Sequence, residues 1–146
     1  MSSRSRLILL SGVLLTGCEH TERVATGTWE LTQTPIVVRF DTPVTAAGPT
    51  RELCLVGSLG NVSTIAPGGP DVVHAVLLTS GGTRDTMDTR NVERRSDEMV
   101  CVWDHGLEGR RPATDLAYTG VELSSSHDVR AREVRWWSGQ RRKWLF

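Results

Sequence analysis

The 146-residue sequence lacks most of the motifs by which enzymes and nucleic-acid-binding proteins are usually identified. None of its three cysteines lies in a CxxC or CxxH motif, no GxSxG nucleophile motif occurs, and no two histidines have H-x-H or H-x₃-H spacing. The formal net charge is zero, and Lys143 is the single lysine. These absences argue against a zinc module with closely spaced ligands, against an α/β-hydrolase and against a nucleic-acid partner.

Long apolar segments are also missing. The longest run, residues 7–15, is interrupted only by Ser11 and Gly12, and about nine residues cannot span a bilayer core of about 30 Å. The residues before it include Arg4 and Arg6 and no acidic residue. A basic start followed by a short apolar run is typical of a leader peptide that is removed after export.

The leader ends in the tetrad Leu15-Thr16-Gly17-Cys18, which resembles the lipobox of bacterial lipoproteins. The resemblance implies that a signal peptidase cuts before Cys18 and that its thiol is joined to diacylglycerol, so that a lipid anchor holds the protein on a membrane. Glu19 stands where many lipoproteins of the inner membrane have aspartate. This difference implies an outer-membrane location, with the domain facing the periplasm. The alternatives are an ordinary secretory leader with a chance cysteine, or a buried N-terminal strand.

The predicted organisation is a signal peptide at residues 1–17, a polar tether at residues 18–27 and one domain at residues 28–146. Cleavage before Cys18 leaves 129 residues, enough for one hydrophobic core. Loss of Arg4 and Arg6 leaves 15 basic against 17 acidic residues, a formal net charge of −2.

The two remaining cysteines, Cys54 and Cys101, are predicted to form a disulfide, because an even pair in an oxidising compartment most simply bonds. The bond would close a loop of 47 residues, and chain entropy assigns such a closure about 4 kcal/mol. Their strands would then meet, joining either two sheets or two neighbouring strands. A metal site is the competing interpretation, but we predict no metal and no cofactor.

Short strand-like runs separated by turn residues predict an all-β fold, either an antiparallel β-sandwich or a small barrel of about seven to eight short strands. The runs are residues 28–32, 36–41, 52–56, 72–79, 99–104, 116–124 and 130–137. Residues 84–98 are almost wholly polar and are predicted to form a hairpin loop or a short irregular strand. Thr42-Pro43 is predicted to form a turn.

No catalytic residues are predicted. Residues 124–128 contain the serine, histidine and aspartate of a hydrolase triad, but neighbours in sequence cannot adopt triad geometry, so this segment is interpreted as a turn. Asp104-His105 together with His127-Asp128 is the histidine pairing with most potential for metal binding. Its residue spacing gives only weak support.

The C-terminal part combines arginine with tryptophan, and Arg130, Arg132, Arg135, Trp136 and Trp137 are the candidate binding patch. Strand alternation places the two tryptophans on opposite faces, so we expect one ring buried and the other at a surface. Such a patch suits phosphorylated lipid headgroups, an anionic wall polymer or an envelope protein. The competing interpretation is a charged edge strand whose arginines prevent sheet association.

The sequence therefore predicts a lipid-anchored envelope protein with a non-enzymatic binding or scaffolding domain. An alternative is an inhibitor of an envelope-attacking enzyme such as a lysozyme, since small lipoprotein β-barrels with one disulfide are known to act in this way. Such an inhibitor needs a protruding loop, for which residues 80–84 are the candidate. A small hydrolase is a third possibility, and it would require a pocket with converging titratable groups.

Overall fold

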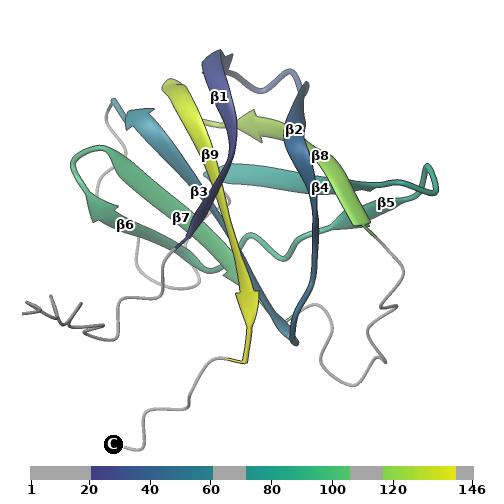
Figure 1. Cartoon of the computed structure of the whole chain (residues 1–146). Helices are drawn as coiled ribbons and strands as arrows, with labels where there is room; N and C mark the ends of the chain where they lie inside the picture. The colour runs from purple at the N-terminus through teal and green to yellow at the C-terminus, as the bar shows by residue number, and fades with distance from the viewer. Residues whose placement is uncertain (1–20, 61–71, 106–116, 141–146) are drawn as a thin grey trace, which may run out of the picture.

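Two antiparallel β-sheets packed against each other make up the computed structural model, which describes residues 21–60, 72–105 and 117–140 (Figure 1). The prediction of an all-β fold is confirmed, and the architecture is a β-sandwich. No helix long and apolar enough to cross a membrane occurs among the described residues.

The nine strands of the described segments are divided between a five-stranded and a four-stranded sheet. The five-stranded sheet has the order β1 (Glu22–Leu31), β9 (Val129–Gly139), β3 (Thr50–Ser58), β7 (Met99–Asp104) and β6 (Val92–Ser96). The four-stranded sheet has the order β2 (Ile36–Thr45), β8 (Ala117–Ser125), β4 (Val73–Thr79) and β5 (Arg84–Thr86).

Each of the seven predicted runs corresponds to one strand, and the differences concern length and the polar segments. Strand β1 begins at Glu22, so residues 22–27 belong to the sandwich and not to the tether. Residues 84–98 contain β5 and β6. The predicted turn at Thr42-Pro43 is wrong, because both residues lie within β2. They fall where the pairing of β2 with β8 is irregular, between Arg39 and Val44, and such irregular positions tolerate a proline.

The hydrophobic core lies between the sheets and is built by alternate residues of the strands. In β3, Leu53 and Leu55 face the core, whereas Glu52 and Cys54 lie on the outer face. β3 is nevertheless buried from Thr50 to Gly57. The most deeply buried apolar side chains of the core include Leu31, Val38, Leu53, Leu77, Val121, Leu123 and Val134.

β9 is an interior strand that pairs with β1 on one side and β3 on the other. The interpretation of residues 130–137 as a charged edge strand is therefore wrong. Both rows of its backbone hydrogen-bonding groups are occupied by neighbouring strands, so its arginines are not needed to block further pairing.

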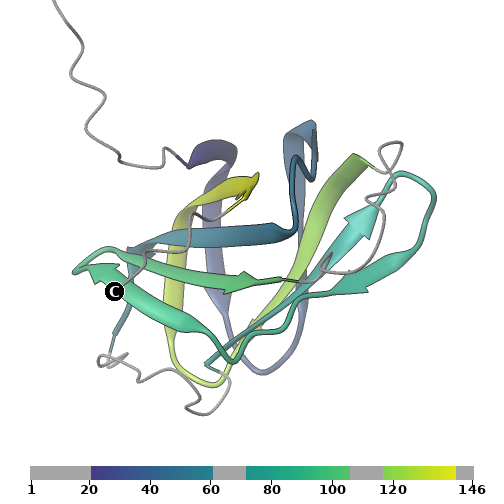
Figure 2. The ribbon, with the colours of Figure 1, turned by 90° about the horizontal axis from the view of Figure 1, so that it is seen from below.

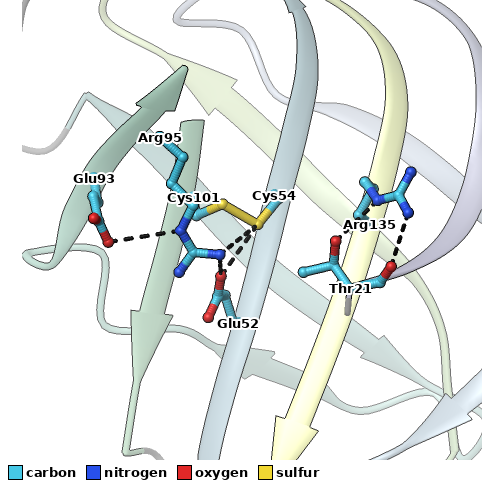
Figure 3. The surroundings of a disulfide bond; sticks show 7 residues. All are labelled: Thr21, Glu52, Cys54, Glu93, Arg95, Cys101 and Arg135. Atoms are coloured by element: carbon cyan, nitrogen blue, oxygen red, sulfur yellow. Dashed lines mark hydrogen bonds and ion pairs between the residues drawn. A yellow bond between two sulfur atoms is a disulfide. The ribbon is translucent and has the colours of Figure 1, made fainter. Parts of the chain in front are cut away.

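Cys54 and Cys101 form the predicted disulfide (Figure 3). The two residues are directly opposite each other on β3 and β7, with their Cα atoms 4.0 Å apart. The bond therefore joins neighbouring strands of one sheet and does not connect the two sheets.

A buried ionic cluster centred on Arg51 connects the sheets instead. The side chain of Arg51 is 1% exposed, and its Nε and Nη2 atoms donate to Asp104 at 3.0 and 2.8 Å. Its Nη1 atom donates to Asp85 at 2.6 Å and to the hydroxyl of Tyr118 at 3.2 Å. Arg51 and Asp104 belong to the five-stranded sheet, and Asp85 and Tyr118 to the four-stranded sheet.

The buried charge of Arg51 is balanced by the hydrogen bonds and opposite charges of its partners in the cluster. Burial by itself disfavours the guanidinium charge, but the hydrogen bonds and charges of its partners outweigh this effect and raise the pKa of Arg51. The Tyr118 hydroxyl donates to Asp85 at 3.1 Å, and the backbone NH of Asp88 donates to Asp104 at 2.9 Å. Such pairing is needed because an unpaired buried charge is strongly destabilising.

We predict that replacing Arg51 with leucine lowers the free energy of unfolding by about 3–5 kcal/mol, because Asp104 is left buried without its partner. The measurement is chemical denaturation of the single variants Arg51→Leu and Asp104→Leu and of the double variant. The double variant should lose less stability than the two single variants together. The exposed Arg84→Gln serves as a control with little effect, since Arg84 pairs with Glu122 at the surface. Strictly additive losses at Arg51 and Asp104 would contradict the coupling.

Candidate binding surface

The two tryptophans of the candidate patch lie on opposite faces of β9, as predicted. Trp136 faces the core and is 3% exposed, whereas Trp137 is partly exposed on the outer face of the five-stranded sheet. Arg135, two residues earlier, shares this outer face and is also partly exposed. An aromatic ring and a guanidinium group thus lie next to each other on one strand.

The arginines of the patch are engaged in ion pairs. Arg130 contacts Glu30 at 3.1 Å, and Arg132 contacts Glu98 at 2.9 Å. Arg135 donates to Glu133 at 3.1 Å. These acidic partners offset the positive charge that the sequence shows, so the patch is not a strongly cationic surface.

A pocket of about 350 Å³ opens beside the tryptophans. Its lining combines the end of β2, the segment after it, the end of β9 and the first residue of β1: Glu22, Pro43, Val44, Thr45, Ala47, Trp136, Trp137 and Ser138. We call it the end pocket, because the start of β1 and the ends of β2 and β9 meet at one end of the sandwich (Figures 1 and 2). Its volume is within the range that holds a small ligand or a side chain of a partner.

The wall of the end pocket is fixed by a close backbone approach. A Cβ added to Gly48 would lie 2.5 Å from the carbonyl carbon of Gly139, so the two segments can meet only because residue 48 has no side chain. The hydroxyl of Ser138 accepts from the NH of Ala47 at 2.8 Å and donates to the carbonyl oxygen of Thr45 at 3.2 Å. These contacts hold the chain after β2 on the end of β9.

Gly139 also sets the position of the Trp137 ring. A Cβ at residue 139 would lie 2.9 Å from a carbon of the six-membered ring of Trp137. The indole therefore lies against the backbone of its own strand, which limits its freedom before any ligand binds.

Trp136 connects the end pocket to the ionic cluster. Its ring meets that of Tyr118 edge-on, with centroids 5.5 Å apart. Its Nε1 atom is buried without a hydrogen-bond partner in the structure. Trp136 therefore contributes an apolar surface to the pocket. The position of the Trp136 ring depends on Tyr118, whose hydroxyl is bonded to Arg51.

A second pocket of about 390 Å³ is formed around the end of β3 and the β6–β7 turn, and it includes Arg132, Glu98, Arg94 and Asp97. Its charges are largely compensated, because Arg132 contacts Glu98 at 2.9 Å and Arg94 lies 3.9 Å from Asp97. It lacks an aromatic wall, so it is a weaker candidate than the end pocket.

Glu52 and the two cysteines form the one group of three potential metal ligands within the described residues, with their ligand atoms within 4.8 Å of one another. Both sulfur atoms belong to the disulfide, so neither is a thiolate in the oxidised protein. Glu52 is 1% exposed and forms an ion pair with Arg95 beside the disulfide (Figure 3). The arrangement is that of a charge pair covering a disulfide.

The structure does not bring together the histidines proposed for metal binding. His105 follows β7 and its Nδ1 atom lies 2.9 Å from the hydroxyl of Thr50. His127 lies in the turn between β8 and β9, with its Nδ1 atom 3.0 Å from the hydroxyl of Ser126. The predicted turn at residues 124–128 is only partly confirmed. Residues 126–128 connect β8 to β9, but Ser124 and Ser125 are the last two residues of β8.

Residues 80–83 of the predicted loop form an exposed turn between β4 and β5 that projects from the side of the molecule (Figure 1), whereas Arg84 is the first residue of β5. Thr79 braces it from within. Its hydroxyl accepts from the NH of Thr83 at 3.0 Å and lies 2.6 Å from the Thr83 hydroxyl. Gly82 has a φ of 80°, a conformation that favours glycine.

Sequence reasoning missed several residues of this site. The end pocket is assembled from four segments, and no local pattern indicates that Glu22, Val44 and Ala47 meet beside Trp137. The sequence contains one indication of the ionic cluster, namely two adjacent charged residues at positions 51 and 52 inside an otherwise apolar strand. Cys18, the predicted lipidation site, lies outside the described residues.

Searches of known protein families, curated protein sequences and solved structures found no match to this chain.

We predict that Tyr118, the single tyrosine of the chain, ionises above the ordinary value of about 10. Burial raises the pKa of its phenol; Arg51 opposes this shift, and Asp85 adds a smaller increase. Because the neutral phenol is favoured in the folded state, its contribution to stability is complete below pH 10 and is lost as the pH rises through the raised pKa. Ultraviolet titration of tyrosinate, in native and unfolded protein, measures the shift. Equal midpoints in the two states would refute the prediction.

Proposed function

We propose that this chain is a lipid-anchored envelope protein whose β-sandwich is a non-enzymatic binding module. The lipobox-like tetrad ending in Cys18 supports the anchor. The observation that carries the binding function is the end pocket, which is lined by the buried Trp136 and by the partly exposed Trp137, the latter on the same face of β9 as Arg135. Aromatic residues beside arginine are favoured at binding surfaces.

The ion pairs of the patch indicate which interactions with a ligand would contribute most to binding. Because Arg130, Arg132 and Arg135 already have acidic partners, binding depends more on contact with the Trp137 ring and on hydrogen bonds than on net positive charge. An anionic wall polymer is therefore a less favoured ligand than an envelope protein or a membrane surface, whose contact areas include apolar groups.

The predicted outer-membrane location and periplasmic orientation are part of this proposal, as is the absence of catalytic activity. The chemistry of the end pocket supports a binding role, because Glu22 is the single titratable residue among the described residues that line it. General acid–base catalysis ordinarily uses at least two groups with different protonation states in one site.

The anchor is tested by replacing Cys18 with serine. We expect the wild-type protein to incorporate labelled palmitate during growth and the Cys18→Ser variant to lose both the label and its membrane fractionation. The sulfur atom is the attachment point, and the serine hydroxyl is a much weaker nucleophile. Label retained by the variant would show that the lipid is not on Cys18.

The binding surface is tested with the soluble domain, starting at residue 19, and its Trp137→Ala variant. Retention on purified cell wall, on vesicles and on immobilised envelope extract is compared for the two proteins. We expect the wild-type domain to be retained in at least one of these assays and the variant to lose about tenfold in affinity, as is common for a central aromatic contact. Trp29→Ala, which removes a tryptophan of β1 outside the end pocket, is the matched control. Equal retention of both variants would contradict the assignment.

Inhibition of an envelope-attacking enzyme such as a lysozyme is a second candidate function, and the braced β4–β5 turn favours it. A preformed loop loses little conformational entropy when it enters a cleft, and residues 80–84 are all exposed. The test is lysis of bacterial cells by lysozyme in the presence of the soluble domain. Full lytic activity at a large molar excess of the domain would exclude this function for the lysozyme used.

A further inference from the structure

Arg135 holds the N-terminal end of the described chain. Its Nε atom donates to the hydroxyl of Thr21 at 2.9 Å, and its Nη2 atom donates to the carbonyl oxygen of Thr21 at 2.9 Å (Figure 3). The third nitrogen, Nη1, donates to Glu133. All three nitrogens of the guanidinium group are therefore used, and two of them fix a residue that lies before the first strand. We call this arrangement the Arg135 clamp.

The clamp leaves very little chain between the sandwich and the proposed lipid. Only Glu19 and His20 separate Cys18 from Thr21, and three residue steps span at most about 11 Å when fully extended. The headgroup layer of one leaflet is itself about 5–8 Å thick. A lipid-bearing Cys18 would thus hold Thr21 immediately above the headgroups, whatever the conformation of residues 18–20.

The residues next to Thr21 belong to the end pocket. Glu22 follows it in sequence and lines the pocket, and Trp137 lies on the same face of β9 as Arg135. The opposite end of the sandwich, where β1 ends and β9 begins, is about 30 Å away along a strand of ten residues. A short tether therefore keeps the end-pocket end next to the membrane, whereas the distance of the opposite end depends on the tilt of the sandwich.

The chemistry of this end suits a lipid interface. Trp137 is partly exposed, and tryptophan is favoured at the level of the headgroups because its ring is amphipathic. Arg23 on β1 is 59% exposed there. β9 ends at the same end of the sandwich (Figure 1). Basic residues near a membrane surface are attracted to anionic lipids.

We infer that the Arg135 clamp positions the domain so that the end of the sandwich with the end pocket contacts the headgroup layer. This membrane is the one in which the lipid anchor is inserted. Lipid headgroups are therefore the partner of the surface formed by the end pocket, Trp137 and Arg135, which we call the Trp137 surface. This inference rests on the lipid anchor of the proposed function. The tether is then shorter than the predicted residues 18–27, and the domain has a fixed orientation. One end faces the membrane and the other end faces away from it.

The experiment uses the full lipidated protein in nanodiscs that contain a small fraction of lipid with a Gd³⁺-chelating headgroup. Paramagnetic broadening of backbone amide signals then reports distance from the membrane surface. We expect the amides of Glu22, Thr45 and Ser138 to broaden several-fold more than those of Thr34 and Ser126 at the opposite end. Equal broadening at both ends, or stronger broadening at the opposite end, would overturn the inference.

Two variants test the clamp itself. Arg135→Gln removes the forked contact with Thr21 and should reduce the difference between the two ends. The matched variant Arg90→Gln, at an exposed arginine outside the patch that pairs with Asp88, should leave the difference unchanged. Insertion of about twelve glycine and serine residues between His20 and Thr21 extends the reach of the tether by about 20 Å and should largely abolish the difference. Equal effects of Arg135→Gln and Arg90→Gln would overturn the role of the clamp. Unchanged amide spectra outside the altered region establish that each variant is folded.

Mass spectrometry of the same samples separates this inference from the function on which it rests. If Cys18 carries no acyl chains, both the anchor and the inferred orientation are wrong. If Cys18 is acylated and the broadening does not distinguish the two ends, the anchor stands and the orientation is wrong. Binding of the wild-type domain to a protein in envelope extract, with no end-selective broadening, would identify the Trp137 surface as a protein interface.

Discussion

The buried ionic cluster in which Arg51 pairs with Asp104 of its own sheet and with Asp85 and Tyr118 of the other sheet is the interaction on which the arrangement of the two sheets depends. Each charge loses its hydration on folding, which costs several kcal/mol, so the pair is tolerated only where hydrogen bonds replace the lost water. The acceptors that satisfy Arg51 come from both sheets, with Asp104 on β7 and Asp85 on β5. An arrangement that separated the sheets or shifted one past the other would leave these charges buried without partners, and this cost favours the observed packing.

The same cluster extends to the candidate site through a single aromatic contact. Tyr118 accepts from Arg51 and packs edge-on against Trp136, and Trp136 forms the wall of the end pocket whose rim is Trp137. The polar cluster thus determines where an apolar surface lies. The disulfide has a more local role, since Cys54 and Cys101 join two strands that are already paired in one sheet.

The strands could be predicted from sequence because alternation and turn residues are local signals, and the run from Met99 to Asp104 was predicted with the observed bounds. The opposite exposure of Trp136 and Trp137 followed from the same alternation. Pairing order could not be predicted, because it depends on contacts between distant segments. For that reason β9 was open to interpretation as an edge strand, and Glu22 could not be placed beside Trp137. Polar segments were also misjudged: residues 22–27 have few apolar side chains to indicate a strand, but pairing with β9 orders them.

The early start of β1 gives the two candidate surfaces different positions. The Trp137 surface lies on the five-stranded sheet beside the clamped Thr21, whereas the β4–β5 turn belongs to the four-stranded sheet and projects from it. The Arg135 clamp leaves only a short tether, which would restrict the Trp137 surface to partners at the membrane. The β4–β5 turn would remain accessible from the periplasm. In the proposed orientation the two surfaces would contact different partners. Because β4 and β8 pair along their length and the Arg51 cluster joins β8 to the other sheet, a rigid connection between them is already present in the fold.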